Sequence, residues 1–250
     1  MIAFVSSVIA YLIFAAVYVA LALFSGDILL PKTVDTGEPA GMTAALLANV
    51  GLLLAWGLQH SVMARQSFKD RLTRVVPEHL ERSFYVLVSS LALVVLMLGW
   101  QPMAGTVWRV APGPLATGLW VLFGLGWVTT LVASYFIDHF DVFGLKQTFS
   151  RWRKSTYQQR GFVAPALYRY VRHPMMTGLL IGFWATPHMT VSHLVLALGM
   201  TLYIHVGVHF EERSLLRELG PAYEDYQART PKFFPGMPRG EADERLPAEG

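Results

Sequence analysis

Residues 175–208 read MMTGLLIGFWATPHMTVSHLVLALGMTLYIHVGV and contain no Asp, Glu, Lys or Arg over 34 positions. One membrane-crossing helix needs about 20 apolar residues, so the window is too long for one crossing and too short for two full ones. Pro187 lies inside it, and a proline ends or kinks a helix because it lacks a backbone N–H and restricts the preceding residue. The window therefore predicts a helical hairpin that turns near Pro187, with a first arm of roughly 12 residues that cannot span the hydrocarbon.

Four further windows without charged residues precede this one, at residues 2–24, 43–63, 83–100 and 115–137. Each has 18 to 23 residues and matches one membrane crossing. Only 15% of the 250 residues are charged, against about 25% in soluble domains. This composition excludes a water-soluble enzyme, a nucleic-acid-binding module and a disordered chain. The first window is expected to be a retained helix rather than a signal peptide.

The positions of the 20 Lys and Arg residues predict the topology. Segments 25–42 and 101–114 contain one basic residue each, whereas 64–82 contains five, 138–174 contains seven and the tail from residue 209 contains six. Because basic loops stay in the cytoplasm, both basic loops and both termini are placed there, and no nucleic-acid partner is expected. The prediction is an all-α integral protein of the inner membrane, with four transmembrane helices plus a C-terminal helical hairpin, about six helices in all.

The second arm of the hairpin is expected to run from about residue 190 to Leu219, beyond the membrane, because Gly220-Pro221 is a helix stop signal. Residues 1–235 are predicted to form one polytopic domain. Residues 236–250 combine Pro, Gly and acidic residues with almost no apolar content, which predicts a disordered tail. The absence of cysteine excludes disulfides, thiolate metal sites and a cysteine nucleophile.

Two groups of charged residues meet where the predicted hairpin closes. Arg172 and His173 precede Pro174 at the start of the first arm, and cations beside a helix N-terminus favour an anion. Glu211 and Glu212 stand where the second arm leaves the membrane. An anion site beside a carboxylate suits a zwitterionic cofactor. A salt bridge between Arg172 and one glutamate, or a snorkelling anchor, is the alternative.

A segment after the fourth window can supply acid–base chemistry. His139 is a possible base, with Asp138 or Asp141 to orient it, and Gln147 adds an amide. The alternative is an ordinary interfacial loop with aromatic anchors.

Gln59 and His60 end the second predicted helix in apolar surroundings, where polar side chains face the bundle or a cavity. A helix–helix hydrogen bond would also explain them. His205, His209 and Glu212 share one helical face and could ligate Zn or Fe. The remaining histidines are scattered singly, so no metal is expected.

Several motifs stand in a characteristic order along the chain: YRYVRHP at 168–174, Gly178, EER at 211–213, Leu216, Gly220, Tyr223, Tyr226 and FFP at 233–235. This set resembles the membrane methyltransferases of the isoprenylcysteine carboxyl methyltransferase superfamily. Further motifs, LQHSVMAR at 58–65, ERS at 81–83, HFDVFGL at 139–145 and FWATPHMT at 183–190, are more similar to the branch that methylates methanethiol. Met176 stands where the carboxyl methyltransferases usually carry tyrosine, which also favours the thiol branch.

The resemblance implies that S-adenosylmethionine binds on the cytoplasmic side and that methanethiol becomes dimethyl sulfide. The lipid-facing architecture suits such a small apolar thiol, which could enter through the lipid bilayer. The residues implied for the cofactor are Tyr168, Arg172, His173, Pro174, Glu211, Glu212, Tyr223 and Tyr226. The candidate bases are His139, oriented by Asp141, and His60, and the residues expected beside the substrate are Gln59, Phe143, Gln147 and Trp184. Another acceptor such as a prenylcysteine carboxylate, a sterol-reductase-like enzyme using NADPH, and a scaffold or transporter remain alternatives.

Overall fold

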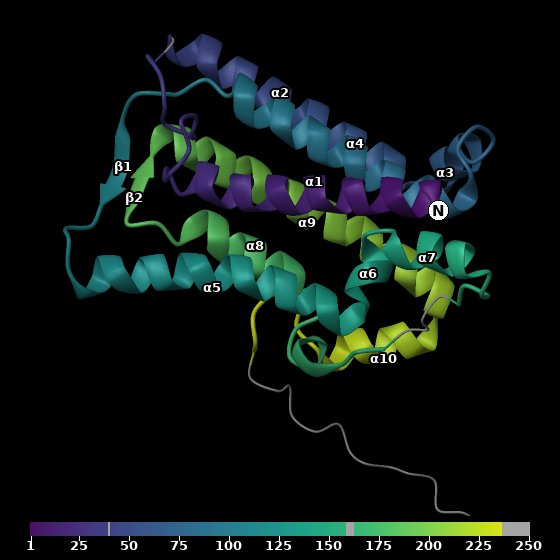
Figure 1. The fold of residues 1–250 in the computed structure, drawn as a ribbon. Helices are drawn as coiled ribbons and strands as arrows, with labels where there is room; N and C mark the ends of the chain where they lie inside the picture. Colours follow the sequence, from purple (N-terminus) through teal and green to yellow (C-terminus); the bar gives the residue numbers. More distant parts are fainter. Residues whose placement is uncertain (40, 159–162, 237–250) are drawn as a thin grey trace, which may run out of the picture.

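The computed structural model describes residues 1–39, 41–158 and 163–236. Within these ranges, five helices are long and apolar enough to cross a membrane: α1 (Ile2–Ser25), α2 (Met42–Ala64), α4 (Glu78–Gly99), α5 (Pro114–Ile137) and α9 (Val191–Leu219). They form an elongated bundle (Figure 1). The prediction of an all-α, multi-pass membrane protein is confirmed. Of the tail predicted to be disordered, residues 237–250 lie outside the described residues.

The predicted C-terminal hairpin is present. Its first arm is α8 (Pro174–Trp184), which has 11 residues, and its second arm is the 29-residue α9. Pro174 occupies the first turn of α8, where a missing N–H breaks no hydrogen bond. The Thr190 hydroxyl caps α9 by accepting from the backbone N–H of His193 at 3.0 Å. α9 ends before Gly220, whose φ of +56° suits glycine.

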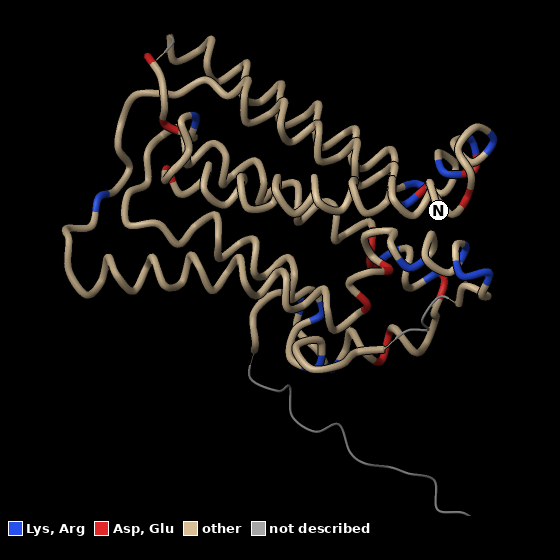
Figure 2. The backbone as a smooth tube through the Cα atoms, viewed as in Figure 1, with Lys and Arg blue, Asp and Glu red and all other residues tan. Residues whose placement is uncertain are grey.

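Short helices gather at one end of the bundle, and none of them was predicted. They are α3 (Gln66–Leu72), α6 (His139–Val142), α7 (Leu145–Arg153), α10 (Pro221–Arg229) and the 3-10 helix η1 (Ala166–Arg169). They carry no long apolar window, so the sequence predicts fewer helices than the described chain contains. Most Lys and Arg residues lie at this end (Figure 2), which we call the basic end.

The opposite end of the bundle carries a two-stranded antiparallel sheet, which was also not predicted. Strand β1 (Thr106–Arg109) lies in the loop before α5, and β2 (His188–Thr190) lies in the turn of the hairpin. The backbone N–H of Val110 donates to the carbonyl of Pro187 at 2.8 Å and extends this pairing. The sheet therefore ties the turn of the hairpin to a loop far away in the sequence. We call this end the sheet end (Figure 1).

Glycines allow α8 to pack directly against the backbone of α5. A Cβ atom built on Gly178 would lie 2.5 Å from the carbonyl oxygen of Gly126, and one built on Gly126 would lie 2.5 Å from the nitrogen of Gly182. The hydroxyl of Thr130 on α5 donates to the carbonyl of Met175 at 3.0 Å. Small residues permit such close approach between membrane helices. This contact fixes the position of α8, and with it the residues at its N-terminus.

Candidate active site

The carboxylate of Glu212 on α9 contacts three basic side chains at the basic end. Arg172 Nε donates to Oε1 at 2.8 Å, and His173 Nε2 lies 3.1 Å from the same oxygen. Lys232 Nζ lies 2.8 Å from Oε2. The side chains of Glu212 and Arg172 are only 8% and 9% exposed. The salt bridge considered as an alternative for Arg172 is therefore present, and Glu212 is its acidic partner.

The segment after α10 covers the start of α8. The backbone N–H of Arg172 donates to the carbonyl of Pro231 at 2.9 Å, and that of His173 donates to the carbonyl of Lys232 at 3.1 Å. Arg172 Nη1 also donates to the carbonyl of Gln227 at 3.0 Å. Arg172 thus joins α8, α9 and the C-terminal segment through both its backbone and its guanidinium group.

Glu211 has a different environment from its neighbour Glu212. Its side chain is 52% exposed, and its Oε2 lies 3.7 Å from Nδ1 of His173. Consecutive residues on a helix point about 100° apart, which explains why one glutamate is buried while the other is accessible. The basic end therefore presents an accessible carboxylate beside the N-terminus of α8, where the helix dipole favours negative charge.

The three tyrosines expected to bind the cofactor lie together near Arg172. Tyr223 is 1% exposed, and its ring centroid lies 5.8 Å from that of Tyr226. The hydroxyl of Tyr226 donates to the carbonyl of Tyr168 at 2.6 Å. Burial raises the pKa of Tyr226 to about 12, although the nearby Arg172 opposes the shift, and burial also raises the pKa of Tyr168. The tyrosines are therefore neutral at physiological pH.

His139 on α6 is buried, and both of its ring nitrogens lie next to hydroxyl groups. Nδ1 is 2.6 Å from the hydroxyl of Ser134, and Nε2 is 2.8 Å from that of Tyr11. Because Ser134 donates its own proton to the carbonyl of Leu131 at 2.6 Å, Nδ1 must be the donor to Ser134. Nε2 then accepts from Tyr11. Burial lowers the pKa of His139 and so favours the neutral ring.

Asp141 does not orient His139, in contrast to the expectation from the sequence. Its Oδ1 accepts from the hydroxyl of Tyr157 at 2.7 Å and from Nε2 of Gln147 at 3.1 Å. The serine and tyrosine described above hold the imidazole instead. Phe143 lies beside His139, with ring centroids 4.8 Å apart. The structure thus brings His139 together with Phe143, and Asp141 together with Gln147.

Gln59 and His60 connect α2 to α4. His60 Nε2 lies 2.7 Å from the hydroxyl of Tyr85, and Gln59 Nε2 donates to the hydroxyl of Ser89 at 3.3 Å. The helix–helix hydrogen bonds considered as an alternative for these residues are therefore present. They do not use every polar atom of the two side chains, because His60 Nδ1 and Gln59 Oε1 are buried without a partner in the described part of the chain.

Two other candidates lie apart from these groups. Trp184 is at the end of α8 nearer the sheet, one helix length from His173, and its indole donates to the hydroxyl of Thr201 at 2.8 Å. His205 Nδ1 lies 2.8 Å from the carbonyl of Thr201, within its own helix. Among the described residues, no group of three or more His, Cys, Asp or Glu side chains is arranged to hold a metal ion.

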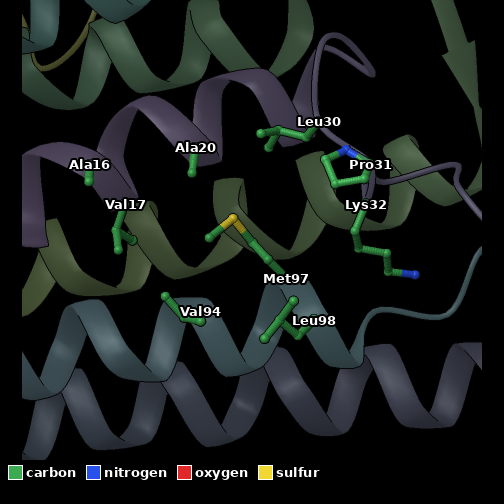
Figure 3. Close-up of a pocket in the computed structure, with 9 residues that line it drawn as sticks. All are labelled: Ala16, Val17, Ala20, Leu30, Pro31, Lys32, Val94, Met97 and Leu98. Carbon is green, nitrogen blue, oxygen red and sulfur yellow. The ribbon is translucent and has the colours of Figure 1, made fainter.

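A pocket of about 310 Å³ lies between α1, the loop after it and α4, toward the sheet end (Figure 3). Its walls are aliphatic apart from the thioether of Met97 and the side chain of Lys32. Lys32 Nζ donates to the carbonyl of Trp100 at 2.8 Å. These walls offer no carboxylate or imidazole for acid–base chemistry, so we do not assign the reaction to this pocket.

Three contacts of the candidate site were missed from the sequence. They are made by Lys232, which pairs with Glu212, and by Tyr11 and Ser134, which hold His139. Tyr11 lies 128 residues before His139. No local pattern marks the contacts of Tyr11 and Lys232, because only the packing of α1 beside α6, and of the C-terminal segment beside α9, brings these side chains to their partners. Ser134 is five residues before His139, at the end of α5.

The chain is similar to several methanethiol S-methyltransferases. It is 45% identical to that of Mycobacterium tuberculosis over 90% of this chain and 92% of the relative. It is 40% identical to methanethiol S-methyltransferase 2 of Bradyrhizobium diazoefficiens over 92% and 89%, and 44% identical to the protein of Crocosphaera subtropica over 85% and 83%. Residues 49–237 match the family described as NnrU protein. The chain therefore belongs to the family of NnrU proteins and methanethiol S-methyltransferases. No solved structure matches it.

This family assignment confirms the closer resemblance drawn from the motifs. The region matched by the NnrU family begins within α2 and extends past α10. It contains all the predicted site residues, from Gln59 to Tyr226. Tyr11, which holds His139, lies outside it on α1.

Proposed function

We propose that the protein transfers a methyl group from S-adenosylmethionine to methanethiol and so forms dimethyl sulfide. The observation that carries the proposal is the 45% identity, over 90% of the chain, with a methanethiol S-methyltransferase. The arrangement of Arg172, His173 and Glu211 at the start of α8 supports it, because this is a suitable place for a small ligand with charges of both signs.

The residues at the start of α8 fit the amino-acid part of S-adenosylmethionine, which carries an ammonium and a carboxylate group. Glu211 offers the ammonium group an accessible carboxylate. The first turn of α8 and His173 favour the carboxylate group. Glu212 is occupied by Arg172 and a lysine, so it positions these basic groups. Further walls are formed by Pro174, Tyr168, Tyr223 and Tyr226.

When bound, S-adenosylmethionine supplies an electrophilic methyl group on a positively charged sulfur. Opposite charges cancel when a thiolate approaches such a sulfonium, so a site poor in water favours the transition state over the charged reactants. An alkanethiol is mostly protonated at neutral pH and must lose its proton to become strongly nucleophilic. His139 and His60 are the candidates for this step, and Phe143, Gln147 and Gln59 are proposed to line the acceptor side.

The proposed orientation places the basic end in the cytoplasm of a cell whose inner membrane holds the bundle, with residues 1–235 acting as one domain. It rests on the concentration of Lys and Arg at that end (Figure 2) and on the tendency of basic loops to remain in the cytoplasm. A water-soluble methyl donor would then reach the start of α8 directly, while an apolar thiol could enter through the bilayer.

The test is an assay of the purified, full-length protein with methyl-labelled S-adenosylmethionine and methanethiol. We expect labelled dimethyl sulfide in the headspace. Turnover of a different acceptor, such as a prenylcysteine carboxylate, without product from methanethiol would overturn the proposed substrate. Failure to detect binding of S-adenosylmethionine by calorimetry would overturn the methyltransferase mechanism itself.

A further inference from the structure

Buried polar atoms without a hydrogen-bond partner concentrate on one face of α2. The described part of the chain contains five such side-chain atoms, and three of them are Trp56 Nε1, Gln59 Oε1 and His60 Nδ1. Spacings of three and four residues place these side chains on the same side of the helix. We call Trp56, Gln59 and His60 the α2 polar cluster.

Aromatic rings from two other helices surround the α2 polar cluster. The His60 ring stacks on Trp56 with centroids 5.3 Å apart, and the ring of Tyr203 on α9 lies 4.8 Å from Trp56. The hydroxyl of the buried Tyr85 on α4 contacts His60 Nε2 at 2.7 Å. The cluster therefore lies within the bundle, between α2, α4 and α9.

Unpaired buried polar atoms are unfavourable, and native proteins pair nearly all of them, so three at one place indicate a ligand that supplies the missing partners. Trp56 Nε1 can only donate and Gln59 Oε1 can only accept, so this ligand must do both. A thiol has one S–H donor and a weakly accepting sulfur, so it can pair with the N–H of Trp56 and with one of the two acceptor atoms. Its sulfur also packs favourably against aromatic rings, and the rings of Trp56, Tyr85 and Tyr203 lie at this place.

His60 differs from His139 in having a ring nitrogen available to a ligand. Both nitrogens of His139 are engaged, by Ser134 and Tyr11. In His60, the tautomer with the proton on Nε2 donates it to Tyr85 and leaves a lone pair on Nδ1. That lone pair belongs to one of the three buried, unpaired atoms of the cluster.

We propose that the α2 polar cluster binds the acceptor thiol and that Nδ1 of His60 takes the thiol proton. This inference rests on the proposed function. The S–H bond breaks as the proton moves to Nδ1, and the electron pair left on sulfur forms the new bond to the methyl group. The bond between the methyl group and the sulfonium breaks, which leaves the donor sulfur neutral. His60 later releases the proton to water.

α9 connects this site to the proposed donor site. Tyr203 borders the α2 polar cluster and stands eight residues before Glu211 on the same helix, which corresponds to about 12 Å along its axis. The acceptor would therefore bind deeper in the bundle than the charged end of the donor. This order agrees with a thiol that arrives from the membrane and a donor that arrives from water.

The first test compares the turnover of methanethiol and thiophenol by His60→Gln. For methanethiol, we expect a loss on the order of 100-fold or more, because a general base contributes at least this much. Thiophenol is a more acidic thiol that ionises without help, so its turnover should fall much less. Calorimetry should give an unchanged affinity for S-adenosylmethionine. The matched control is His79→Gln, at the start of α4, which should behave like the wild type.

The second test measures thiol binding without turnover. Ethanethiol should raise the unfolding temperature of the donor-free wild type, since a ligand stabilises the state that binds it. Trp56→Phe removes the indole N–H donor while keeping an aromatic ring. Ethanethiol should therefore no longer raise the unfolding temperature of this variant. Trp120→Phe, on the exposed surface of α5, is the control and should retain the shift.

The inference is overturned if His60→Gln converts methanethiol at the wild-type rate, or if its turnover of methanethiol and of thiophenol falls by the same factor. It is also overturned if ethanethiol still raises the unfolding temperature of Trp56→Phe. Failure of the proposed function has a different signature, because the wild type itself would then make no dimethyl sulfide.

Discussion

Glu211 and Glu212 are adjacent in the sequence but have different tasks in the structure. The carboxylate of Glu212 is buried and holds Arg172, His173 and Lys232, whereas that of Glu211 is half-exposed beside His173. A buried carboxylate with several basic partners positions its surroundings. The water molecules around an accessible carboxylate can be displaced by a ligand.

Glutamine substitutions should separate these two roles. We expect Glu211→Gln to weaken binding of S-adenosylmethionine about 10- to 100-fold through loss of a charge-assisted contact, with little change in stability. Glu212→Gln should lower the free energy of unfolding by about 3–5 kcal/mol, because it leaves the buried Arg172 without its acidic partner. Calorimetry and thermal unfolding measure the two effects.

Glu218→Gln is the matched control for both substitutions, because Glu218 is an exposed residue of the same helix. It should change neither binding nor stability. A Glu211→Gln variant that binds the donor as tightly as the wild type would contradict the role given to Glu211.

His139 should contribute a pH-dependent part of the stability. Burial lowers the pKa of His139 from its ordinary value of 6.5, so the unfolded chain takes up a proton at this histidine more readily than the folded protein does. The resulting stabilisation is present above pH 6.5 and is lost as the pH falls from there toward the pKa of the folded state.

Chemical denaturation of the wild type and His139→Gln between about pH 5 and 8, the range in which a histidine ordinarily titrates, can measure this contribution. The difference in unfolding free energy between the two proteins should decrease as the pH is lowered. A difference that grows toward low pH would show that His139 is protonated in the folded protein.

At the scale of the elements, α8 is too short to cross the membrane, so its position depends on its neighbours. Gly178 brings its backbone against α5, and the N–H groups of Arg172 and His173 bind the segment after α10. The packing of one helix thus determines where the residues of the proposed donor site lie.

Gly178→Ala should disturb this packing and the donor site together. The added methyl group would lie 2.5 Å from both the carbonyl oxygen of Gly126 and the hydroxyl of Thr130, so the helices must separate. We expect a loss of about 1–3 kcal/mol in stability and weaker binding of S-adenosylmethionine. Thermal unfolding and calorimetry measure these two quantities.

Gly118→Ala provides the control, because a Cβ there has no atom within 4 Å. Alanine is the better helix former, so this variant should be as stable as the wild type or slightly more stable. Equal behaviour of the two alanine variants would refute the importance of the α5–α8 contact.

At the scale of the whole molecule, the bundle separates a basic end from a sheet end (Figures 1 and 2). The proposed donor site lies at the basic end, and the α2 polar cluster lies between helices that are long enough to cross the membrane. Under the proposed function, a charged donor would therefore reach the protein from the water and an apolar acceptor would reach it from the membrane.

Single cysteines can test the orientation, because the natural chain contains none. With the basic end in the cytoplasm, a membrane-impermeant maleimide should label Glu38→Cys in intact cells and Val75→Cys only after lysis. Both positions are exposed, at the sheet end and the basic end respectively. Labelling in the reverse order would contradict the orientation.

Much of the fold could be predicted because it depends on local properties of the chain. Windows without charge correspond to the five long helices, and Pro187 marks the turn of the hairpin. The same reasoning missed the β1–β2 pairing, since three- and four-residue strands have no distinctive pattern and form only where two distant segments meet.

The sequence by itself determined the membrane class, the hairpin and the set of chemically capable residues, because hydropathy, helix signals and side-chain chemistry are encoded locally. The tertiary structure decided how those residues are used. Arg172 pairs with Glu212, and His139 is held by Ser134 and Tyr11 rather than by Asp141. One ring nitrogen of His60 has no hydrogen-bond partner among the described residues. Hydrogen bonding and burial depend on which helices pack together, and residues far apart in the chain supply the partners.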